Sequence, residues 1–433
     1  MRIITKKFVS LCQIITIPKY EERHQSPKTV MIKSIRLKNF FSFSAATIEL
    51  NQMNALIGIN GSGKSNFLKA INVLKVVVVE GGLSDLIINQ WGGFDAVCFS
   101  GKTNQPNPHI ELEFEFDKDA LQGFGYTFYQ SVFYQIHLYK VPSTQNFSVE
   151  EYFYKKNEEG RMGYIYLRMA NGKGFVRESI NDEQVTVNYQ LEDSMNSILS
   201  QLVDKDRYYH IFALREAIKS IAVYSYFDTS IKSAIRKPGV VTSAIRLASD
   251  GANLPQLLNR IKINNKADYN AIKQAFTTVN PNYTDFDYNI MGTNIELMLE
   301  EASLNRSVHV THISDGTLRY LCLLSIIYNV QRGVVVCIDE PEVGLHPDMI
   351  YELMAGMKSR QSETQFIVST HNENVLNQFS VEDVLVCEKS EENATTLSVF
   401  RDEEFKQWAA AYATGRLWRN GDLGGNRYLK VSN

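Results

Sequence analysis

The chain has 433 residues, of which 44% are hydrophobic and 21% charged, and its formal net charge is −3. This ordinary globular composition excludes a disordered tail protein, a collagen-like fibre and a disulfide-stapled miniprotein. At about 150 residues per domain the length predicts two or three domains, or one large α/β domain with an inserted lobe. The charge argues against a protein coated with basic residues for nucleic acid, but it leaves room for a local basic patch.

Compartment signals in the sequence are few. No apolar stretch reaches the roughly 18–20 residues that a membrane span needs. The apolar run near the N-terminus ends at Ile17-Pro18-Lys19, which is a poor signal-peptide cleavage site. The five cysteines form no CxxC pair, and we expect packed thiols in a reducing cytoplasm, away from any membrane. They are Cys12, Cys98, Cys322, Cys337 and Cys387.

The first structured segment is expected to begin at Met31, which could also be the natural start, after an N-terminal arm at residues 1–30. Residues 31–50 alternate with period two and predict two short strands. The apolar run 54–60 predicts a third strand, which leads into glycines and then into residues 65–78 with helical spacing. The predicted order is therefore strand, glycine-rich turn and helix.

In the middle of the chain, a region with strand-like patterns is followed by a region with helical spacing. Residues 109–117 alternate strictly and predict a half-exposed strand, and the Tyr- and Phe-rich region 126–191 predicts an antiparallel meander. We interpret these aromatics as core and cross-strand pairs, with a base-stacking surface as the alternative. Helical spacing then predicts helices at 194–203, 213–223, 253–263 and 267–279.

The last third of the chain returns to alternating strands and helices. Strands are predicted at 294–301 and 307–314, followed by a buried helix at 318–330 and a buried parallel strand at 334–339. A helix at 351–359 and buried strands at 365–370 and 381–388 complete the pattern. The fold class is α/β, and the organisation predicts one domain in two parts, 31–117 and 281–433 with a C-terminal tail, split by a lobe of strands and then helices at 118–280.

The strongest motif is Gly58 to Ser65, which matches G-x4-G-K-[ST] between a predicted strand and a predicted helix. The glycines let backbone N–H groups form an anion nest, and the helix points its positive end at phosphates. Lys64 adds a charge at the β- and γ-phosphates, and the Ser65 hydroxyl is a ligand for Mg²⁺. The motif predicts ATP and Mg²⁺ binding by Asn60, Gly61, Ser62, Gly63, Lys64, Ser65 and Asn66.

A second motif is the apolar strand that ends in Asp339-Glu340. In a doubly wound sheet the carboxyl end of a strand lies at the ligand edge. We expect Asp339 to hold Mg²⁺ and Glu340 to polarise the attacking water. Adjacent acids are common at turns, so this motif gains its weight from the phosphate loop that accompanies it.

The third motif is Ser314 to Thr317, immediately before the predicted buried helix. A serine there is a good N-cap, and a helix N-terminus with Ser314 and Gly316 also suits a γ-phosphate. The triplet Ser249-Asp250-Gly251 competes for the same role. Ser314 is preferred because one helix separates it from Asp339, and Ser249 is expected to cap the helix at 253–263.

The fourth motif combines Gly344 to Pro347, just past the acidic pair, with His371 at the end of a predicted strand. His371 could reach a γ-phosphate from that edge. Taken alone such a histidine is usually a satisfied turn residue, and its place in the ordered set favours the functional interpretation.

These four signals in this order resemble the ABC-type ATPases, specifically the soluble branch with RecF-like, SMC-like and OLD-like proteins. The resemblance identifies Walker A (58–65), signature (314–317), Walker B with its catalytic glutamate (334–340), D-loop (344–347) and the switch histidine His371. The start MIKSIRLKNFFSF also looks like the opening strand of that branch, and the segments GANLPQLL, SDGTLRYLCLL and GRLWRNGDLGG look like predicted bacterial RecF-like AAA ATPases. The resemblance covers nearly the whole chain except residues 1–30 and much of 118–230. It implies an ABC-type P-loop sheet split by an inserted α+β lobe.

Three departures from the family pattern matter. The signature has SDGT instead of the transporter-type SGGQ. Gln90 is only a weak candidate for the Q-loop glutamine, since a surface polar residue explains it equally well. About sixty residues follow His371, which leaves no room in this chain for the nuclease domain of OLD-like proteins.

The resemblance implies a composite site that hydrolyses ATP to ADP and phosphate. Each protomer would bind Mg-ATP, and Ser314 and Gly316 of a second protomer would cover the γ-phosphate. Hydrolysis by Glu340 would release the two subunits, with His371 sensing or stabilising the γ-phosphate. We therefore expect a homodimer or higher homo-oligomer that switches a separate effector protein, a nuclease or toxin, in bacterial anti-phage or toxin-type defence.

The alternative is a RecF-like repair or recombination ATPase that binds DNA directly. Its basic groove would use residues that are more often a solvated face. These are Lys232, Arg236, Lys237, Arg246, Arg260, Lys262 and Lys266. A transporter subunit is disfavoured because the signature follows Walker A too late, and a kinase because no acceptor-site motif is present. The spacing of His309 and His312 disfavours a metal site there.

Overall fold

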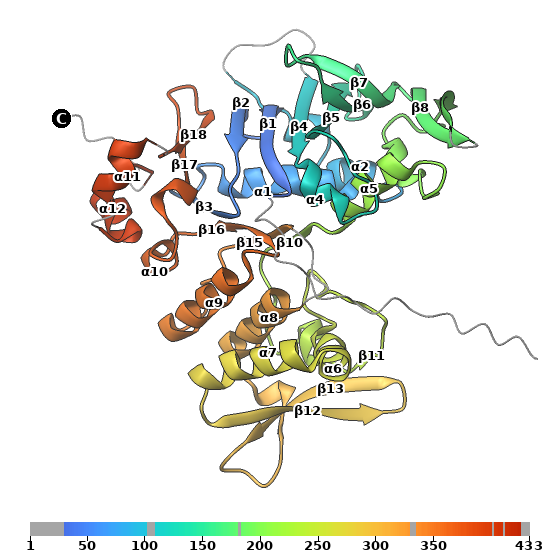
Figure 1. Cartoon of the computed structure of the whole chain (residues 1–433). Coiled ribbons are helices and arrows are strands. Elements are labelled where there is room, and N and C mark those ends of the chain that lie inside the picture. The colour runs from blue at the N-terminus through green and yellow to red at the C-terminus, as the bar shows by residue number, and fades with distance from the viewer. Residues whose placement is uncertain are drawn as a thin grey trace, which may run out of the picture.

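The computed structural model describes residues 30–101, 109–180, 183–329, 335–400, 402–409 and 412–425. The predicted arm, apart from Val30, and Cys12 lie outside these residues. The described elements stack in layers (Figure 1): an antiparallel sheet at the top, helices, a mostly parallel sheet, further helices and a small sheet at the bottom.

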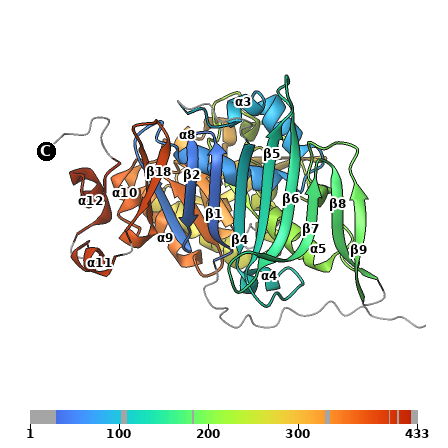
Figure 2. The same ribbon diagram turned by 90° about the horizontal axis from the view of Figure 1, so that it is seen from above.

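The upper sheet is antiparallel and follows the order β2-β1-β4-β5-β6-β7-β8-β9. Its face is seen in Figure 2. The strands are β1 (Ile32–Phe40), β2 (Phe43–Glu49), β4 (His109–Phe116), β5 (Val132–Lys140), β6 (Phe147–Lys156), β7 (Met162–Ala170), β8 (Lys173–Ile180) and β9 (Glu183–Gln190). The predicted meander is confirmed, and β4 joins it to β1. The predicted division at 117/118 falls just after β4, and it stays a prediction.

The aromatic residues of the meander lie where the core interpretation placed them. Tyr134 and Phe153 are fully buried, and the rings of Phe133 and Tyr154 stack across β5 and β6 at 5.5 Å. Such pairs stabilise a sheet through apolar burial and ring stacking. These residues are therefore core and cross-strand pairs.

The central sheet has the order β10-β15-β16-β3-β17-β18, and all its pairings are parallel except that of β18. Its strands are β3 (Met53–Ile57), β10 (Ala222–Tyr224), β15 (Val335–Asp339), β16 (Gln365–Ser369), β17 (Val384–Lys389) and β18 (Thr395–Val399). Their apolar runs are explained by burial on both faces. Val335 and Cys337 belong to the upper core, and Val336 and Ile338 to the lower core.

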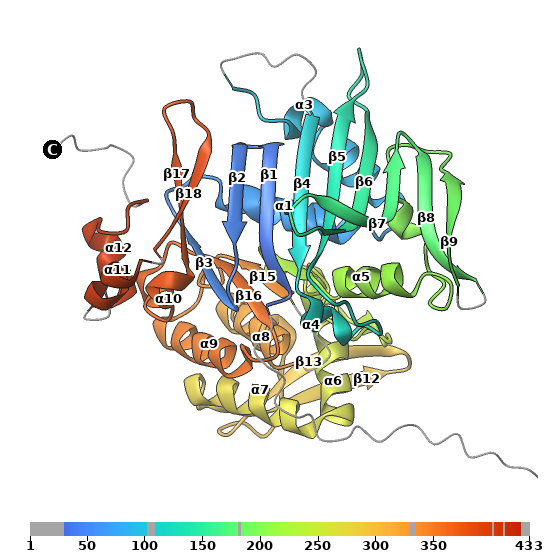
Figure 3. The same cartoon turned by 45° about the horizontal axis from the view of Figure 1, so that its top comes forward.

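The helices cover both faces of the central sheet (Figure 3). Above it lie α1 (Lys64–Val76) and α5 (Tyr209–Lys219), and below it lie α8 (Asp315–Tyr328), α9 (Pro347–Arg360), α6 (Leu254–Asn264) and α7 (Lys266–Val279). Eleven residues of α8 are buried, as expected for a helix packed on several sides.

Shorter elements complete the described chain. The helical ones are α2 (Gly82–Ser84), a π-helix (Asp85–Gln90), α3 (Phe94–Val97), α4 (Lys118–Gln122), α10 (Glu373–Leu376), α11 (Glu403–Ala409) and α12 (Thr414–Asn420), with 3₁₀ turns at Ile198–Ser200, Ala234–Arg236, Val310–His312 and Val381–Asp383. The small lower sheet contains β11 (Gly239–Val240), β12 (Tyr283–Met291), β13 (Asn294–Glu301) and β14 (Val308–His309).

Three sequence predictions are wrong here. The helix predicted at 213–223 ends at Lys219, because residues 222–224 pair with β15 as the edge strand β10. The helix predicted at 194–203 is only a 3₁₀ turn, because the buried Glu151 carboxylate accepts the Ile198 N–H at 2.6 Å and the Ser197 hydroxyl at 2.7 Å. These bonds hold the backbone in a turn. The strand predicted at 307–314 ends after His309, where a 3₁₀ turn presents the Val310 carbonyl to the Arg236 guanidinium at 2.6 Å.

A buried histidine in α5 predicts acid sensitivity of the fold. His210 is fully buried beside Tyr126, Tyr166 and Tyr209, and burial lowers its pKa to about 4. A lowered folded-state pKa means that this histidine's contribution to stability is complete above its unfolded pKa of about 6.5 and is lost as pH falls toward 4. At pH 5 the loss is about 2 kcal/mol.

We therefore expect His210→Leu to lose less unfolding free energy than the wild type between pH 8 and pH 5. Urea unfolding at both pH values measures the difference. The control is His312→Leu, because His312 is exposed. Equal acid losses in wild type and His210→Leu would contradict the prediction.

Candidate functional site

The phosphate loop connects the carboxyl end of β3 to the start of α1. Gly63 has φ 115°, and a Cβ there would lie 2.3 Å from Thr395 Oγ1, so only glycine fits. Lys64 is nearly buried, and its ammonium donates to the carbonyls of Gly58 at 2.8 Å and Ile59 at 3.1 Å. The lysine therefore folds back across its own loop, and burial lowers its pKa.

Two residues outside the motif support this loop. The Thr395 hydroxyl donates to the Ser62 carbonyl at 2.7 Å, and the Thr395 N–H donates to the Ser42 carbonyl at 2.6 Å. The Asn66 amide in turn donates to the Ser42 hydroxyl at 2.9 Å. No sequence pattern points to Ser42 or Thr395, since each acts only through contacts with distant segments.

The acidic pair meets the phosphate loop at one sheet edge. The Ser65 hydroxyl donates to Asp339 Oδ2 at 3.2 Å, and the Ser369 hydroxyl donates to Asp339 Oδ1. The Glu340 N–H donates to the Ser369 carbonyl at 3.1 Å. Ser369 was not predicted as a site residue, although its place at the end of the strand before His371 is a signal for it.

Glu340 and His371 are brought into direct contact. His371 Nε2 lies 3.0 Å from Glu340 Oε1, and both side chains are partly exposed. Glu340 has φ 48°, a left-handed conformation that costs a non-glycine residue energy. Burial, followed by the positive charge of Lys64, lowers the pKa of His371, which favours its neutral form.

A further carboxylate, Glu342, fixes the segment that carries His371. Its Oε1 accepts the Thr370 hydroxyl at 2.7 Å and the His371 N–H at 3.0 Å. Burial raises the pKa of Glu342, and these hydrogen bonds oppose the rise. The sequence interpretation missed Glu342, whose position two residues after Glu340 was the available signal.

The geometry predicts that Glu342 positions the His371 segment for turnover. Replacement by alanine leaves the Thr370 hydroxyl and the His371 N–H without this acceptor. We expect kcat of Glu342→Ala to fall by up to about 100-fold, as for displaced catalytic groups, with KM little changed. Glu342→Gln retains an acceptor oxygen and should keep most of the activity. Steady-state ATPase assays test this, and an unchanged kcat in Glu342→Ala would refute it.

The signature segment lies beside the D-loop of the same chain. Ser314 is the N-cap of α8, and its hydroxyl accepts the Thr317 N–H at 3.2 Å, which confirms the capping interpretation. A Cβ on Gly316 would lie 2.6 Å from the Gly344 carbonyl, so the two loops pack closely. Ser314 is exposed, and its hydroxyl forms hydrogen bonds with Thr317 in its own turn.

The second Ser-Asp-Gly triplet has a different place. The helix α6 begins after Asn253, so the prediction that Ser249 caps it is wrong. The Asn253 side chain accepts the Ala248 N–H at 2.7 Å and donates to the Arg246 carbonyl at 2.9 Å. This amide organises the turn that the serine was expected to organise.

The basic residues proposed for a DNA groove are mostly engaged in the fold. Arg236 is buried, and its guanidinium binds Asp315 Oδ1 at 2.6 Å and the Thr229 carbonyl at 2.8 Å. The prediction that Arg236 belongs to an exposed basic groove is therefore wrong. Arg236 instead fixes the turn that contains the signature segment. Other members donate to backbone carbonyls: Arg246 to Lys219, Arg260 to Ser243 and Lys262 to Phe286.

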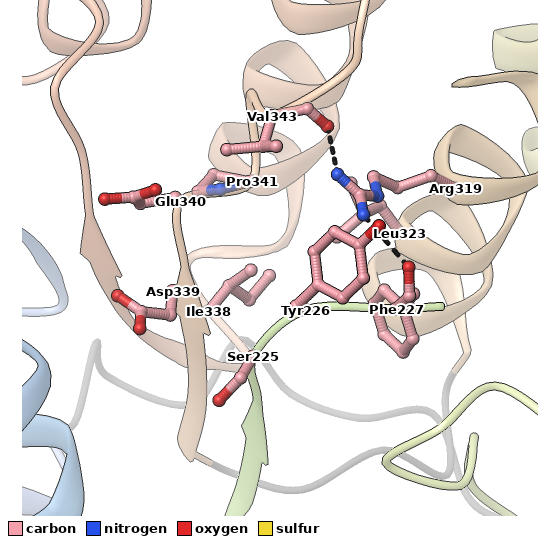
Figure 4. Close-up of a pocket in the computed structure, with 10 residues that line it drawn as sticks. All are labelled: Ser225, Tyr226, Phe227, Arg319, Leu323, Ile338, Asp339, Glu340, Pro341 and Val343. Carbon is pink, nitrogen blue, oxygen red and sulfur yellow. Dashed lines mark hydrogen bonds between the residues drawn. The ribbon is translucent and has the colours of Figure 1, made fainter. Parts of the chain in front are cut away.

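A cavity of about 190 Å³ opens beside the acidic pair on the β10 side, lined in part by Tyr226, Phe227 and Ile338 (Figure 4). The Arg319 guanidinium donates to the Val343 carbonyl at 2.5 Å and to the Phe227 carbonyl at 2.9 Å. Figure 4 shows the Asp339 and Glu340 carboxylates pointing away from Arg319. Arg319 therefore joins α8, the D-loop and the segment after β10.

The remaining predicted positions lie apart from these contacts. Gln90 is exposed, and its amide donates to Asp85 Oδ2 at 2.8 Å; its Q-loop role stays a prediction. Among the described residues no group of three or more His, Cys, Asp or Glu is suited to hold a metal ion. Cys322, Cys337 and Cys387 are buried free thiols, and Cys98 is partly buried.

The residues fit a magnesium nucleotide. Gly61 has φ 79°, and a Cβ there would meet no atom within 4 Å, so the loop is open at this point. The Ser65 hydroxyl and the Asp339 carboxylate lie side by side, and oxygen ligands of this kind are those that Mg²⁺ prefers. The chemistry of the donor set thus suits phosphate on one side and a hard cation on the other.

This arrangement of a phosphate loop after β3, an acidic pair after β15 and a histidine after β16 defines a P-loop ATPase of the ABC type. Residues 53–377 match the family described as "AAA domain, putative AbiEii toxin, Type IV TA system". The match spans most of the chain, and the chain belongs to this family. No curated protein matches the chain.

Solved structures share the fold. The Smc head bound to the C-winged helix domain of ScpA is 15% identical, with a TM-score of 0.56 over 87% of this chain and 100% of that chain. An Smc head with an extended coiled coil, bound to the C-terminal domain of ScpA and derived from Pyrococcus furiosus, is 14% identical, with a TM-score of 0.55 over 88% of this chain and 99% of that chain.

Within the described residues, none of the helices has the length and apolar character that a membrane span requires.

Proposed function

We propose that this chain is a switch subunit that binds and hydrolyses Mg-ATP, closes as a dimer around ATP and controls a separate effector protein in bacterial anti-phage or toxin-type defence. The observation that carries the proposal is the convergence of Ser65, Asp339, Glu340 and His371 at one edge of the central sheet. Family membership supports the ATPase part of the proposal.

Catalysis would rest on position and charge. The backbone N–H groups of residues 60–66 and the Lys64 ammonium bind the phosphates, and Ser65 and Asp339 would hold Mg²⁺, which supplies positive charge to the phosphate oxygens. Glu340 accepts a proton from the attacking water. Neutral His371, 3.0 Å from Glu340 Oε1, orients that carboxylate and the γ-phosphate.

The dimer part of the proposal is supported by the signature segment. Ser314 is exposed at the N-terminus of α8, a fourteen-residue helix whose dipole favours an anion there. Its turn is fixed by Arg236 and packs on the D-loop. We infer that Ser314 and Gly316 of a second copy cover the γ-phosphate, so that ATP joins two subunits as in the RecF, SMC and OLD branch.

The effector part of the proposal is supported by the names of similar proteins. The family description refers to a type IV toxin–antitoxin system, and the solved Smc heads are bound to domains of ScpA. An ATPase whose dimerisation depends on nucleotide can control a partner that binds the two states with different affinity.

The test is to purify the Glu340→Gln variant from its native host in Mg-ATP and to identify what accompanies it, with Lys64→Ala as the control. We expect a stoichiometric nuclease or toxin that is absent from Lys64→Ala and whose activity changes when ATP is added. Salt-sensitive nucleic acid without a protein partner would refute effector control and support the RecF-like alternative.

A further inference from the structure

The outer edge of the upper sheet is open along β9. This strand pairs with β8 in a continuous register without a bulge, and it pairs with no other described strand. Figure 2 shows β9 at the right-hand end of the sheet. The opposite edge strand, β2, contacts β18 of the central sheet. Of the two ends of the upper sheet, β9 is therefore the one with no further strand beside it among the described residues.

The hydrogen bonds show which backbone groups face outward. The Leu191 N–H donates to the Gly172 carbonyl at 2.7 Å, whereas the Ser179 N–H donates away from β9, to the Arg207 carbonyl at 2.8 Å. Ser179 lies opposite Gln184. Because antiparallel pairs alternate, the odd-numbered residues of β9 bond to β8. Gln184, Thr186 and Asn188 therefore direct their N–H and carbonyl groups outward.

The side chains do not protect this edge. Natural edge strands are commonly blocked by lysine, proline, a bulge or short length. The eight residues of β9 include no lysine, arginine or proline. Gln184, Thr186, Asn188 and Gln190 are exposed and uncharged, and the valines at 185 and 187 are half-buried on the other face. Glu183 stands at the start of β9, and from Gln184 to Gln190 a second strand can add without burying a charge.

We propose that β9 pairs antiparallel with β9 of a second copy of this chain, about a two-fold axis at Thr186. This register places Thr186 opposite Thr186, Gln184 opposite Asn188 and Val185 opposite Val187. From Gln184 to Asn188, each outward-facing N–H then meets an outward-facing carbonyl, polar residues face polar residues, and the valines face each other. The same register places Glu183 opposite Tyr189. The contact is isologous and continues the upper sheet across both subunits.

This pairing differs from the ATP-dependent dimer because no residue of the phosphate loop or signature takes part. It therefore forms without nucleotide, and the Lys64→Ala variant forms it as well. Together the two contacts would allow ATP-joined pairs to assemble further. The self-complementary register is what favours a second copy over a strand from an unrelated protein.

The experiment is sedimentation equilibrium of the full chain in EDTA without nucleotide. We expect a dimer for the wild type and monomers for Thr186→Lys and for Thr186→Glu, because like charges then face each other across the axis. An equal mixture of these two variants should restore the dimer. The matched control is Thr47→Glu, an exposed threonine on edge strand β2, which should stay dimeric.

Three results would overturn the proposal. They are a monomeric wild type across micromolar concentrations, a dimer that persists in Thr186→Lys, and a mixture that remains monomeric although both variants unfold cooperatively on heating. Each leaves the proposed ATPase switch untouched, since nucleotide is absent throughout.

Discussion

Lys64→Ala should abolish ATP binding. The ammonium is held over its own loop by two carbonyls, at 2.8 and 3.1 Å, and it is the positive side chain that the loop directs toward phosphate. Charge-assisted hydrogen bonds from this ammonium to the β- and γ-phosphates would contribute about 1.5–3 kcal/mol each, so losing two of them weakens ATP binding by at least about 100-fold. Titration calorimetry with ATP and Mg²⁺ measures the change.

The control for this variant lies on the same helix. Lys69→Ala removes an ammonium that lies 4.1 Å above the ring centre of Phe41, outside the phosphate loop. Its ATP affinity should match the wild type. Tight ATP binding by Lys64→Ala would show that residues 58–65 are not the nucleotide site.

Glu340→Gln should bind ATP, stall hydrolysis and accumulate the closed dimer. Glutamine can keep a hydrogen bond to His371 Nε2 but cannot accept the proton of the attacking water, so turnover should fall by about 100-fold or more. Phosphate release measures turnover, and light scattering with and without ATP measures the dimer. Hydrolysis at the wild-type rate would exclude Glu340 as the catalytic base.

A second substitution in the Glu340→Gln background tests the signature. Ser314→Glu places a negative charge where the γ-phosphate of the second copy is proposed to lie, and it should prevent the ATP-dependent dimer. Ser249→Glu is the matched control, because it alters an exposed serine in the other Ser-Asp-Gly triplet. Equal dimerisation in both double variants would refute the role of Ser314.

Local patterns predicted those parts of the fold that local forces determine. The order of β3, the phosphate loop and α1 follows from apolar periodicity and glycine, and β15 and β16 follow from short apolar runs that are typical of a strand buried on both faces. The helix predicted at 194–203 failed because one distant side chain, Glu151, binds the backbone there. No periodicity within that segment contains this information.

The residues of the site likewise fall into those that local motifs predict and those that only tertiary contacts determine. Motif spacing pointed to Lys64, Asp339 and His371, whose residue types the phosphate chemistry itself demands. Their supporting partners, such as Thr395 and Glu342, are determined by which strands become neighbours. The case of Arg236 is similar, since a basic residue in a loop gives no indication that its guanidinium is buried against Asp315.

The neighbours of β3 in the central sheet have a consequence for synthesis of the protein. β3 carries the phosphate loop, yet it is flanked by β16 and β17, whose residues are translated some three hundred positions later. While the ribosome makes the intervening chain, β3 lacks both strands that shield it, and Gly58 has no Cys387 carbonyl beside it. The nucleotide site can therefore assemble only after β16 and β17 have been translated, and chains released earlier would not compete for ATP.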